Sequence, residues 1–262
     1  MTLRRTPSSI WHDLRISTPE EADIEVMAYF CGATVKYRHL TSCAARIVGK
    51  GNKAIITVDQ SSRPERQRFS VAHELGHWLH DRGEMVFNCH TADISPNRYK
   101  NYETDPEAAA NRFAAELLMP SLLFREVATS LPITFETANQ LARLFQVSET
   151  AAAVRLVELG SFPSIIVCHG IKGYKWSWRH PELPFSVRVR RLLSKHTEAY
   201  RLLRDPSYAP PGPSEVDADD WVDHATGGEY VVTEDSIRLD SRTTLSLIWW
   251  HDESALIAAD DY

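Results

Sequence analysis

Residues 66–80 (RQRFSVAHELGHWLH) constrain the fold of this chain more than any other stretch. Their pattern predicts one helix, with Pro64 in a first turn that tolerates its missing N–H. His73 and His77 are four residues apart, so their side chains lie one above the other on one helix face. Two imidazoles placed in this way can hold one metal ion. The residues that recur at helical spacing and would face the core are Phe69, Ala72, Gly76 and Leu79.

Glu74 completes the pattern H-E-x-x-H, which is typical of zinc peptidases in which the glutamate is the general base. The alternative is an ordinary helix that happens to carry two surface histidines. Pro64 and the apolar stripe favour the metal site over that alternative. Gly76 favours it too, because a glycine inside a helix lowers stability and more often marks close packing.

His80 is a tempting third ligand, but the spacing argues against it. It follows His73 by seven residues, which is about 10 Å along a continuous helix. One ion cannot easily be reached from both positions. We therefore expect His80 to support the site indirectly or to be a packed histidine.

A second helix is predicted between residues 105 and 120, with Asp105 as its cap and Pro106 in its first turn. Glu107 is a candidate third ligand, and Asn111, four residues later, could orient a ligand imidazole. By spacing alone it is equally plausible that Glu107 only favours the positive end of the helix dipole. Glu116 is the rival carboxylate, and a solvated helix position suits it better.

Two motifs together resemble the ImmA/IrrE family of bacterial metallopeptidases: RQRFSVAHELGH at residues 66–77 and E-x-x-A-N-x-F-A-A-E-L-L-M-P at residues 107–120. The resemblance extends over about residues 20–160. It implies a zincin-like fold, with His73, His77 and Glu107 as metal ligands and Glu74 as the general base. It also implies a cytoplasmic protease that cleaves a helix-turn-helix (XRE-type) transcriptional repressor, relieving repression under stress or in a mobile-element or toxin–antitoxin-like system.

The composition is that of a folded protein outside the membrane. Hydrophobic residues make up 43% of the 262 residues, and the net charge of −6 argues against a dedicated nucleic-acid binder. We expect no signal peptide, because no apolar run follows Arg4 and Arg5, and no apolar run in the sequence is long enough to span a membrane. The cysteines are scattered without C-x-x-C spacing, which indicates reduced thiols and a cytoplasmic location; they are Cys31, Cys43, Cys89 and Cys168.

We expect an α+β protein with four segments. They are a flexible N-terminus (1–18), a zincin-like metallopeptidase domain (19–120), a helical helix-turn-helix-like segment (121–161) and a C-terminal α+β domain (162–262). In the second segment, one helix starts at Thr18 and Pro19 and ends at Gly32. Strands are predicted at 34–38, 45–48 and 54–58, the last two joined as a hairpin through Gly49–Asn52. Residues 54–59 could bind substrate as an added strand, although a plain structural role suits them equally well.

Residues 82–104 are polar and without pattern, which predicts a loop beside the site. A donor is needed there for the oxyanion that forms during hydrolysis, and Tyr99, Tyr102, His90 or His80 could supply it. The pair Cys89-His90 could approach the ion, but an ordinary loop pair is the better interpretation.

Three short helices are predicted at 121–128, 135–145 and 149–159, with a turn at 146–148 that resembles a helix-turn-helix. The main alternative function for the chain is DNA-binding regulation, which this segment would perform. Between 134 and 160, two arginines stand against three glutamates, so packing or contact with a repressor fits better than contact with phosphates.

Strands are predicted in residues 162–262 at 164–168, 229–232, 236–240 and 243–250, with a hairpin turn at 233–235 and a helix at 188–203. Residues 172–204 hold nine basic and two acidic residues, whereas 205–262 hold two and fourteen. The simplest interpretation is that these halves neutralise each other within one domain. Some members of the family carry a C-terminal sensor-like domain, and regulation or substrate docking is our hypothesis for this segment.

The sequence thus predicts metal-assisted peptide hydrolysis. Zn²⁺ suits the two histidines and the glutamate, and Mn²⁺ is not excluded, because selection depends on geometry and availability. The alternative is a protein that sequesters a repressor without cutting it, or that regulates transcription directly.

Overall fold

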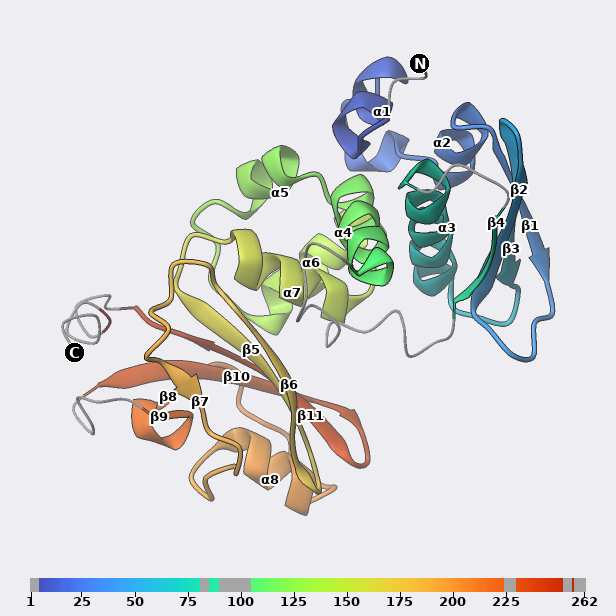
Figure 1. The fold of residues 1–262 in the computed structure, drawn as a ribbon. Helices are drawn as coiled ribbons and strands as arrows, with labels where there is room; N and C mark the ends of the chain where they lie inside the picture. The colour runs from blue at the N-terminus through green and yellow to red at the C-terminus, as the bar shows by residue number, and fades with distance from the viewer. Residues whose placement is uncertain (1–4, 81–84, 90–104, 224–229, 252–255, 257–262) are drawn as a thin grey trace. The chain divides into compact units, whose positions relative to one another are not determined.

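A computed structural model describes residues 5–80, 85–89, 105–223, 230–251 and 256 (Figure 1). The chain is an α+β protein, as expected. Its packing forms two compact units: described residues within 1–124 and 142–148 form the first, and those within 125–141 and 149–262 form the second. Such units are not the same as functional domains, so the domain boundaries expected from the sequence stay a prediction.

The first unit begins with helix α1 (Pro7–Asp13), where the sequence analysis expected a flexible segment. Thr6 caps this helix reciprocally with Ser9, and the helix buries Ile10 and Trp11. Trp11 Nε1 donates a hydrogen bond of 2.9 Å to the carbonyl of Leu117. The expectation was wrong here because two buried side chains outweigh the polar composition around them.

The helix expected from Thr18 to Gly32 is in fact two elements. Thr18 and Pro19 start only a 3-10 turn, η1 (Pro19–Glu21). Helix α2 (Ile24–Phe30) then begins anew at Asp23, whose side chain accepts from the N–H groups of Glu25 and Val26. The second cap interrupts the helix, because the backbone of a capping residue is extended.

A four-stranded sheet follows, in the order β1-β3-β2-β4. Its strands are β1 (Ala33–Arg38), β2 (Ala45–Lys50), β3 (Lys53–Asp59) and β4 (Met85–Cys89). The predicted hairpin joins β2 to β3, with Gly51 at φ +61° in the turn, and β1 pairs parallel to β3. Because β3 is paired on both sides, residues 54–59 cannot receive a substrate as an added strand, and that suggestion was wrong.

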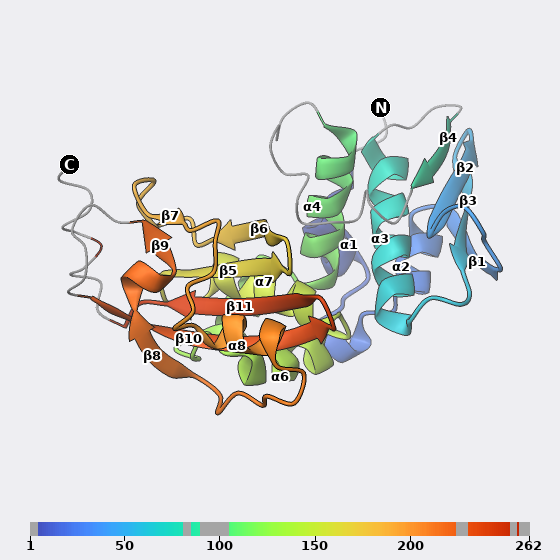
Figure 2. The same cartoon turned by 90° about the horizontal axis from the view of Figure 1, so that it is seen from below.

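Helix α3 (Pro64–His80) packs on one face of this sheet, and helix α4 (Pro106–Leu118) packs on α3. Figures 1 and 2 both show α3 between the sheet and α4. Both helices have the extents that the sequence predicts. Asp105 caps α4 by accepting from the N–H of Glu107 at 3.0 Å.

Three shorter helices match their predicted bounds: α5 (Ser121–Ala128), α6 (Phe135–Phe145) and α7 (Glu149–Leu159). Gln146 has φ +54° in the turn between the last two. The division between the two units falls within α5 and α6. A role of these helices in DNA binding stays a prediction.

The second unit is built on a five-stranded sheet in the order β6-β5-β11-β10-β8. Its strands are β5 (Ser164–Gly170), β6 (Gly173–Arg179), β8 (Ser214–Asp217), β10 (Val231–Asp240) and β11 (Thr243–Trp249). Helix α7 packs against β5 and β6, and helix α8 (Glu198–Arg204) against β10 and β11. The remaining elements are the strand pair β7 (Arg188–Val189) and β9 (Val222–Asp223) and the 3-10 turn η3 (Ala218–Asp220).

Two predictions in this unit were wrong. Residues 233–235 are not a hairpin turn but lie inside β10, where the acidic Glu234 and Asp235 are buried because helix N–H groups are available to them. Residues 188–203 are not one helix, since β7 occupies their start and Thr197 caps α8 late in the segment.

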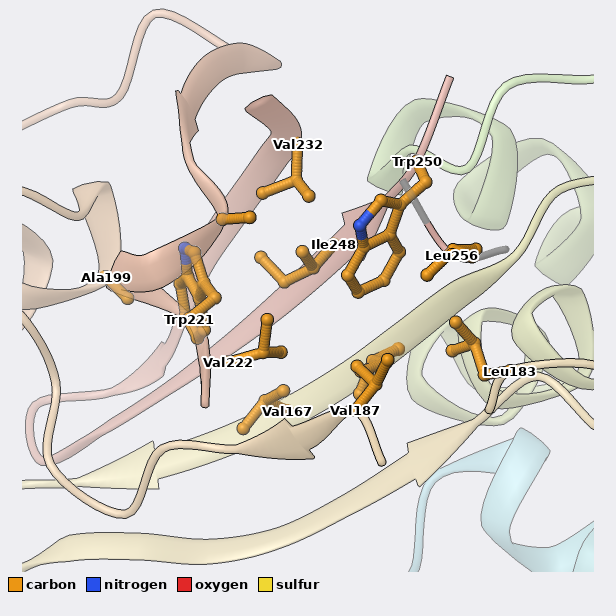
Figure 3. Close-up of a cluster of buried hydrophobic side chains, with 12 residues drawn as sticks. Val167, Leu183, Val187, Ala199, Trp221, Val222, Val232, Ile248, Trp250 and Leu256 are labelled. Atoms are coloured by element: carbon orange, nitrogen blue, oxygen red, sulfur yellow. The ribbon is translucent and has the colours of Figure 1, made fainter. Parts of the chain in front are cut away.

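A hydrophobic cluster forms the core of the second unit (Figure 3). Trp221 and Trp250 are its largest members, and each is at most 2% exposed. Val167 of β5, Ile248 of β11 and Val232 of β10 project toward them from neighbouring strands of the sheet.

Candidate metal centre

The H-E-x-x-H segment lies in the middle of α3, where every residue from Ser70 to Leu79 is buried. His73 and Glu74 are 0% exposed and His77 is 1% exposed. The alternative of two surface histidines is therefore wrong, because both rings lie inside the protein. Burial of three polar side chains on one helix requires compensating partners.

Close packing of α3 on α4 brings a carboxylate to these histidines. A Cβ added at Gly76 would lie 3.1 Å from Ala110 Cα and 3.2 Å from Phe113 Cβ, which is closer than side chains normally approach. Gly76 thus allows the two helix backbones to meet, as its position in the sequence suggested. Glu107 lies in the first turn of α4, on the side that faces α3.

The side chains of His73, His77 and Glu107 converge on one another. The two Nε2 atoms are 3.1 Å apart, and Glu107 Oε2 and Oε1 lie 3.2 Å from His73 Nε2 and 3.3 Å from His77 Nε2. Bonds of 2.0–2.1 Å in tetrahedral geometry would separate such ligand atoms by about 3.3–3.4 Å. The three groups therefore fit a metal ion in both donor chemistry and spacing.

Asn111, one turn after Glu107, reaches the far side of the first histidine. Its Oδ1 lies 2.9 Å from His73 Nδ1. An amide oxygen can only accept, so Nδ1 of His73 carries the proton and Nε2 presents its lone pair to the cluster. Phe69 stacks on the same ring, with centroids 6.3 Å apart.

The pKa of Glu107 is set by two opposed effects. Burial alone would raise it, but when the rings of His73 and His77 are protonated, their N–H groups and positive charges outweigh that effect and hold the pKa well below its usual range. The carboxylate therefore remains ionised at neutral pH, which is the form that binds a cation.

Two other candidates lie elsewhere. His80 Nδ1 donates to the carbonyl of Gly76 at 2.9 Å, and its ring packs edge-on against Phe113. Glu116 accepts from the N–H and hydroxyl of Ser121 at 2.9 and 2.6 Å, so it joins the end of α4 to the start of α5. The sequence analysis expected a solvated glutamate at that position.

Several suggested residues lie outside the described part of the chain. The oxyanion-donor candidates His90, Tyr99 and Tyr102 belong to residues 90–104, and the side chain of Cys89 is not described either. Their roles stay predictions.

Sequence reasoning missed the contribution of α1 to the site. The hydrogen bond from Trp11 to Leu117 fixes α1 on the last turn of α4, the helix that positions Glu107 and Asn111. The signal that could have revealed α1 is Thr6-Pro7-Ser-Ser9, in which a capping threonine precedes a helix-starting proline.

Paired histidines on one helix and a carboxylate from the next are the donor set of metal-dependent hydrolases. Residues 19–157, which are 139 of the 262 residues, match the model of the IrrE N-terminal-like domain family (Peptidase_M78). The chain therefore belongs to this family, and the resemblance of its motifs is confirmed. The family implies a bound metal, for which the cluster described above is the candidate site.

Three curated relatives are similar to this chain, and each match covers 42% of it. The radiation response metalloprotease IrrE of Deinococcus deserti is 34% identical over 116 residues, and that of Deinococcus radiodurans is 31% identical over 112. The metallopeptidase ImmA of Bacillus subtilis is 32% identical over 114 residues. The matches span 38%, 33% and 60% of these relatives' own lengths.

A solved structure described as a Mycobacterium tuberculosis transcriptional regulator shares the fold. It is 16% identical, with a TM-score of 0.59, and the similarity covers 97% of this chain and 78% of that one. Within the described residues, no helix has both the length and the apolar character that crossing a membrane requires.

Proposed function

We propose that this chain is a metal-dependent endopeptidase that cleaves a helix-turn-helix transcriptional repressor of the XRE type. The observation that carries the proposal is the convergence of His73 Nε2, His77 Nε2 and the Glu107 carboxylate within 3.1–3.3 Å. Membership of the IrrE N-terminal-like family supports it. Cleavage would relieve repression, and the name of the Deinococcus relatives suggests a stress response as the setting.

In this proposal His73, His77 and Glu107 hold the metal ion, with Zn²⁺ as the first candidate and Mn²⁺ as the second. When bound, the ion would polarise the scissile carbonyl and lower the pKa of water. Asn111 holds the ring of His73 in the tautomer that leaves Nε2 free to bind.

Glu74 is the proposed general base. It follows His73 directly on α3 and is fully buried, so its carboxylate is shielded from bulk water. It takes the proton of the attacking water and passes it to the leaving amine. Removing the carboxylate while keeping the side-chain size should therefore stop hydrolysis and leave the cluster intact.

The test is to incubate the metal-loaded protein with helix-turn-helix repressors encoded near its own gene and to follow intact masses. We expect a cut that Glu74→Gln slows by about 10²–10⁴-fold, the usual contribution of a general base. Glu65→Gln, the same change in the first turn of the same helix, is the matched control and should cut normally. A chelator should stop the reaction, and reloading with Zn²⁺ or Mn²⁺ identifies the better ion.

Full cleavage by Glu74→Gln would refute the proposed mechanism, in which Glu74 is the general base. Stable binding of a repressor without a cut, equal in the wild type and Glu74→Gln, would instead favour the sequestering alternative. We also propose that residues 162–262 serve regulation or substrate docking.

A further inference from the structure

The sheet of the first unit has one face that no described element of that unit covers. Helices α2 and α3 pack on the other face (Figures 1 and 2). Along β1, β3 and β2 the side chains alternate between these faces. Those on the packed side are largely buried, whereas most of those on the opposite side, here named the outer face, are exposed.

The strand register arranges the outer face in rows that cross the strands. The central row is apolar or uncharged, and its members are Thr34, Ile55 and Val48. A row with two cations lies on one side of it and includes Lys36, Thr57 and Arg46. A pair of lysines, Lys53 and Lys50, lies on the other side.

The central row exposes aliphatic surface. Val48 and Ile55 are 50% and 42% exposed, and they are direct cross-strand partners. A pair of β-branched side chains at the centre of an open sheet face would normally be covered by another element. Among the described side chains of this face, the pair lies between Arg46 and Lys50 along β2 and between Lys53 and Thr57 along β3.

Among the described residues, four cations of the outer face have no carboxylate partner. Lys36, Arg46, Lys50 and Lys53 form no ion pair with any carboxylate in the described part of the chain. Lys50 and Lys53 stand directly opposite each other, an arrangement that destabilises a sheet. The nearest acidic position on this face is Asp59, whose carboxylate already accepts from Leu40 and Ser61.

We propose that the outer face binds an amphipathic helix of a partner protein, with an aliphatic stripe flanked on both sides by Asp and Glu. Rows two residues apart along a strand are separated by about 7 Å. A helix about 10–12 Å wide that lies along the central row would therefore place its flanking carboxylates over the two cation rows. An apolar centre with a charged rim is the usual anatomy of a protein interface.

Nucleic acid fits this surface less well. Sheets that bind single strands stack the bases on aromatic side chains, and the described outer positions of β1, β2 and β3 carry none. The aromatic residue of β1, Tyr37, lies on the packed side and donates its hydroxyl to Glu25 at 2.9 Å. The aliphatic row has no role in binding phosphates.

The proposal does not depend on proteolysis. Helix α3 carries the candidate metal ligands on the opposite face of the sheet, so an occupant of the outer face does not enter the cluster. If the chain is an endopeptidase, the outer face selects its substrate. If it only sequesters a partner, the outer face is where it does so.

The test uses the full chain with Glu74→Gln in every sample, so that cleavage cannot disturb binding. The probe is a fluorescein-labelled helical peptide of about 18 residues, with leucines on one stripe and glutamates beside it. Anisotropy titrations compare this background with Lys36→Glu/Arg46→Glu, Lys50→Glu/Lys53→Glu and Val48→Ser/Ile55→Ser. Lys172→Glu/Lys195→Glu, which reverses two exposed cations of the second unit, is the matched control.

We expect each outer-face variant to bind the peptide at least about tenfold more weakly, and the control to bind as the background does. A peptide with lysine in place of glutamate should not bind. Equal binding by all variants would overturn the proposal, as would tighter binding of a DNA duplex that depends on the same cations. Thermal unfolding of each variant verifies that the sheet is still folded. The substituted side chains are exposed, so little change in stability is expected.

Discussion

Both units bury charged side chains, but they arrange them in opposite ways. In the second unit Glu234 is 0% exposed, and the donors to its carboxylate include Ala199 N at 2.8 Å, Trp221 Nε1 at 3.1 Å and Ser236 Oγ at 2.7 Å. The neighbouring Asp235 accepts from the N–H of Phe135 at 2.7 Å. One carboxylate thus holds the first turn of α8 and the next holds the start of α6.

In the first unit, atoms that carry lone pairs face one another instead. The ring nitrogens of His73 and His77 and the carboxylate of Glu107 meet within 3.3 Å. A carboxylate surrounded by N–H and O–H donors is satisfied by the protein itself. Groups that converge on a common point require a shared proton or a cation between them. Burial alone therefore does not distinguish a structural network from a binding site, whereas the direction of the lone pairs does.

The largest expected effect concerns metal binding. Glu107→Gln removes one of three ligands, which is worth on the order of 4 kcal/mol, so affinity for Zn²⁺ should fall about a thousandfold. Stability of the metal-free protein should fall as well, because the neutral amide loses the interactions with the histidines that lower the pKa of the carboxylate. Competition with a chromophoric chelator measures the affinity, and denaturant unfolding measures the stability.

Glu116→Gln is the matched control for that change, since Glu116 lies on the same helix and bonds to Ser121 rather than to the histidines. It should leave the affinity for Zn²⁺ unchanged. Equal affinities of Glu107→Gln and the wild type for Zn²⁺ would show that Glu107 is not a metal ligand.

For Glu234, the buried carboxylate of the second unit, we expect a loss of stability without a loss of metal affinity. Glu234→Ala leaves the N–H groups of Ala199 and Trp221 without their acceptor and removes one of two partners of the Ser236 hydroxyl, which should lower the free energy of unfolding by roughly 3–4 kcal/mol. Affinity for Zn²⁺ should not change. Glu215→Ala, at an exposed position of the adjacent strand β8, should alter neither quantity, and a similar loss in both variants would contradict the comparison.

This contrast also explains what the sequence could reveal. The metal cluster rests on local spacing, four residues on α3 and a capped first turn on α4, so residues 73, 77, 107 and 111 could be selected without a structure. Whether Glu107 would reach the histidines depended on the approach of the two helices at Gly76, which only packing decides.

The network of the second unit has no such local signal. Glu234 and Asp235 resemble turn residues in the sequence, because the helix N–H groups that they accept from lie 35 and 100 residues away along the chain. The edge position expected for residues 54–59 was wrong for a related reason. Strand order is set by the parallel pairing of β1 with β3, and local pattern does not encode it.

The smallest expected effect concerns the pH dependence of stability, and it tests whether His169 of the second unit is kept neutral by burial. His169 is 1% exposed on β5, near Trp221 and Tyr174, and burial lowers its pKa from 6.5 to about 4, although the backbone of Arg190 partly favours the charged form. Because the unfolded chain takes up this proton first, the contribution of His169 to stability is complete above about pH 6.5 and is lost as the pH falls to about 4, for a total of about 3 kcal/mol.

Glu234 and Asp235 titrate with the opposite sign, since burial raises the pKa of each, so the effect of His169 must be isolated by difference. The unfolding free energy of the wild type minus that of His169→Asn, followed by tryptophan fluorescence, should fall by about 3 kcal/mol between pH 7 and pH 4. A flat difference would mean that this histidine is charged or solvated in the folded protein. The second unit would then also contain a buried polar group that the protein itself does not satisfy. The distinction between the two units would fail at that residue.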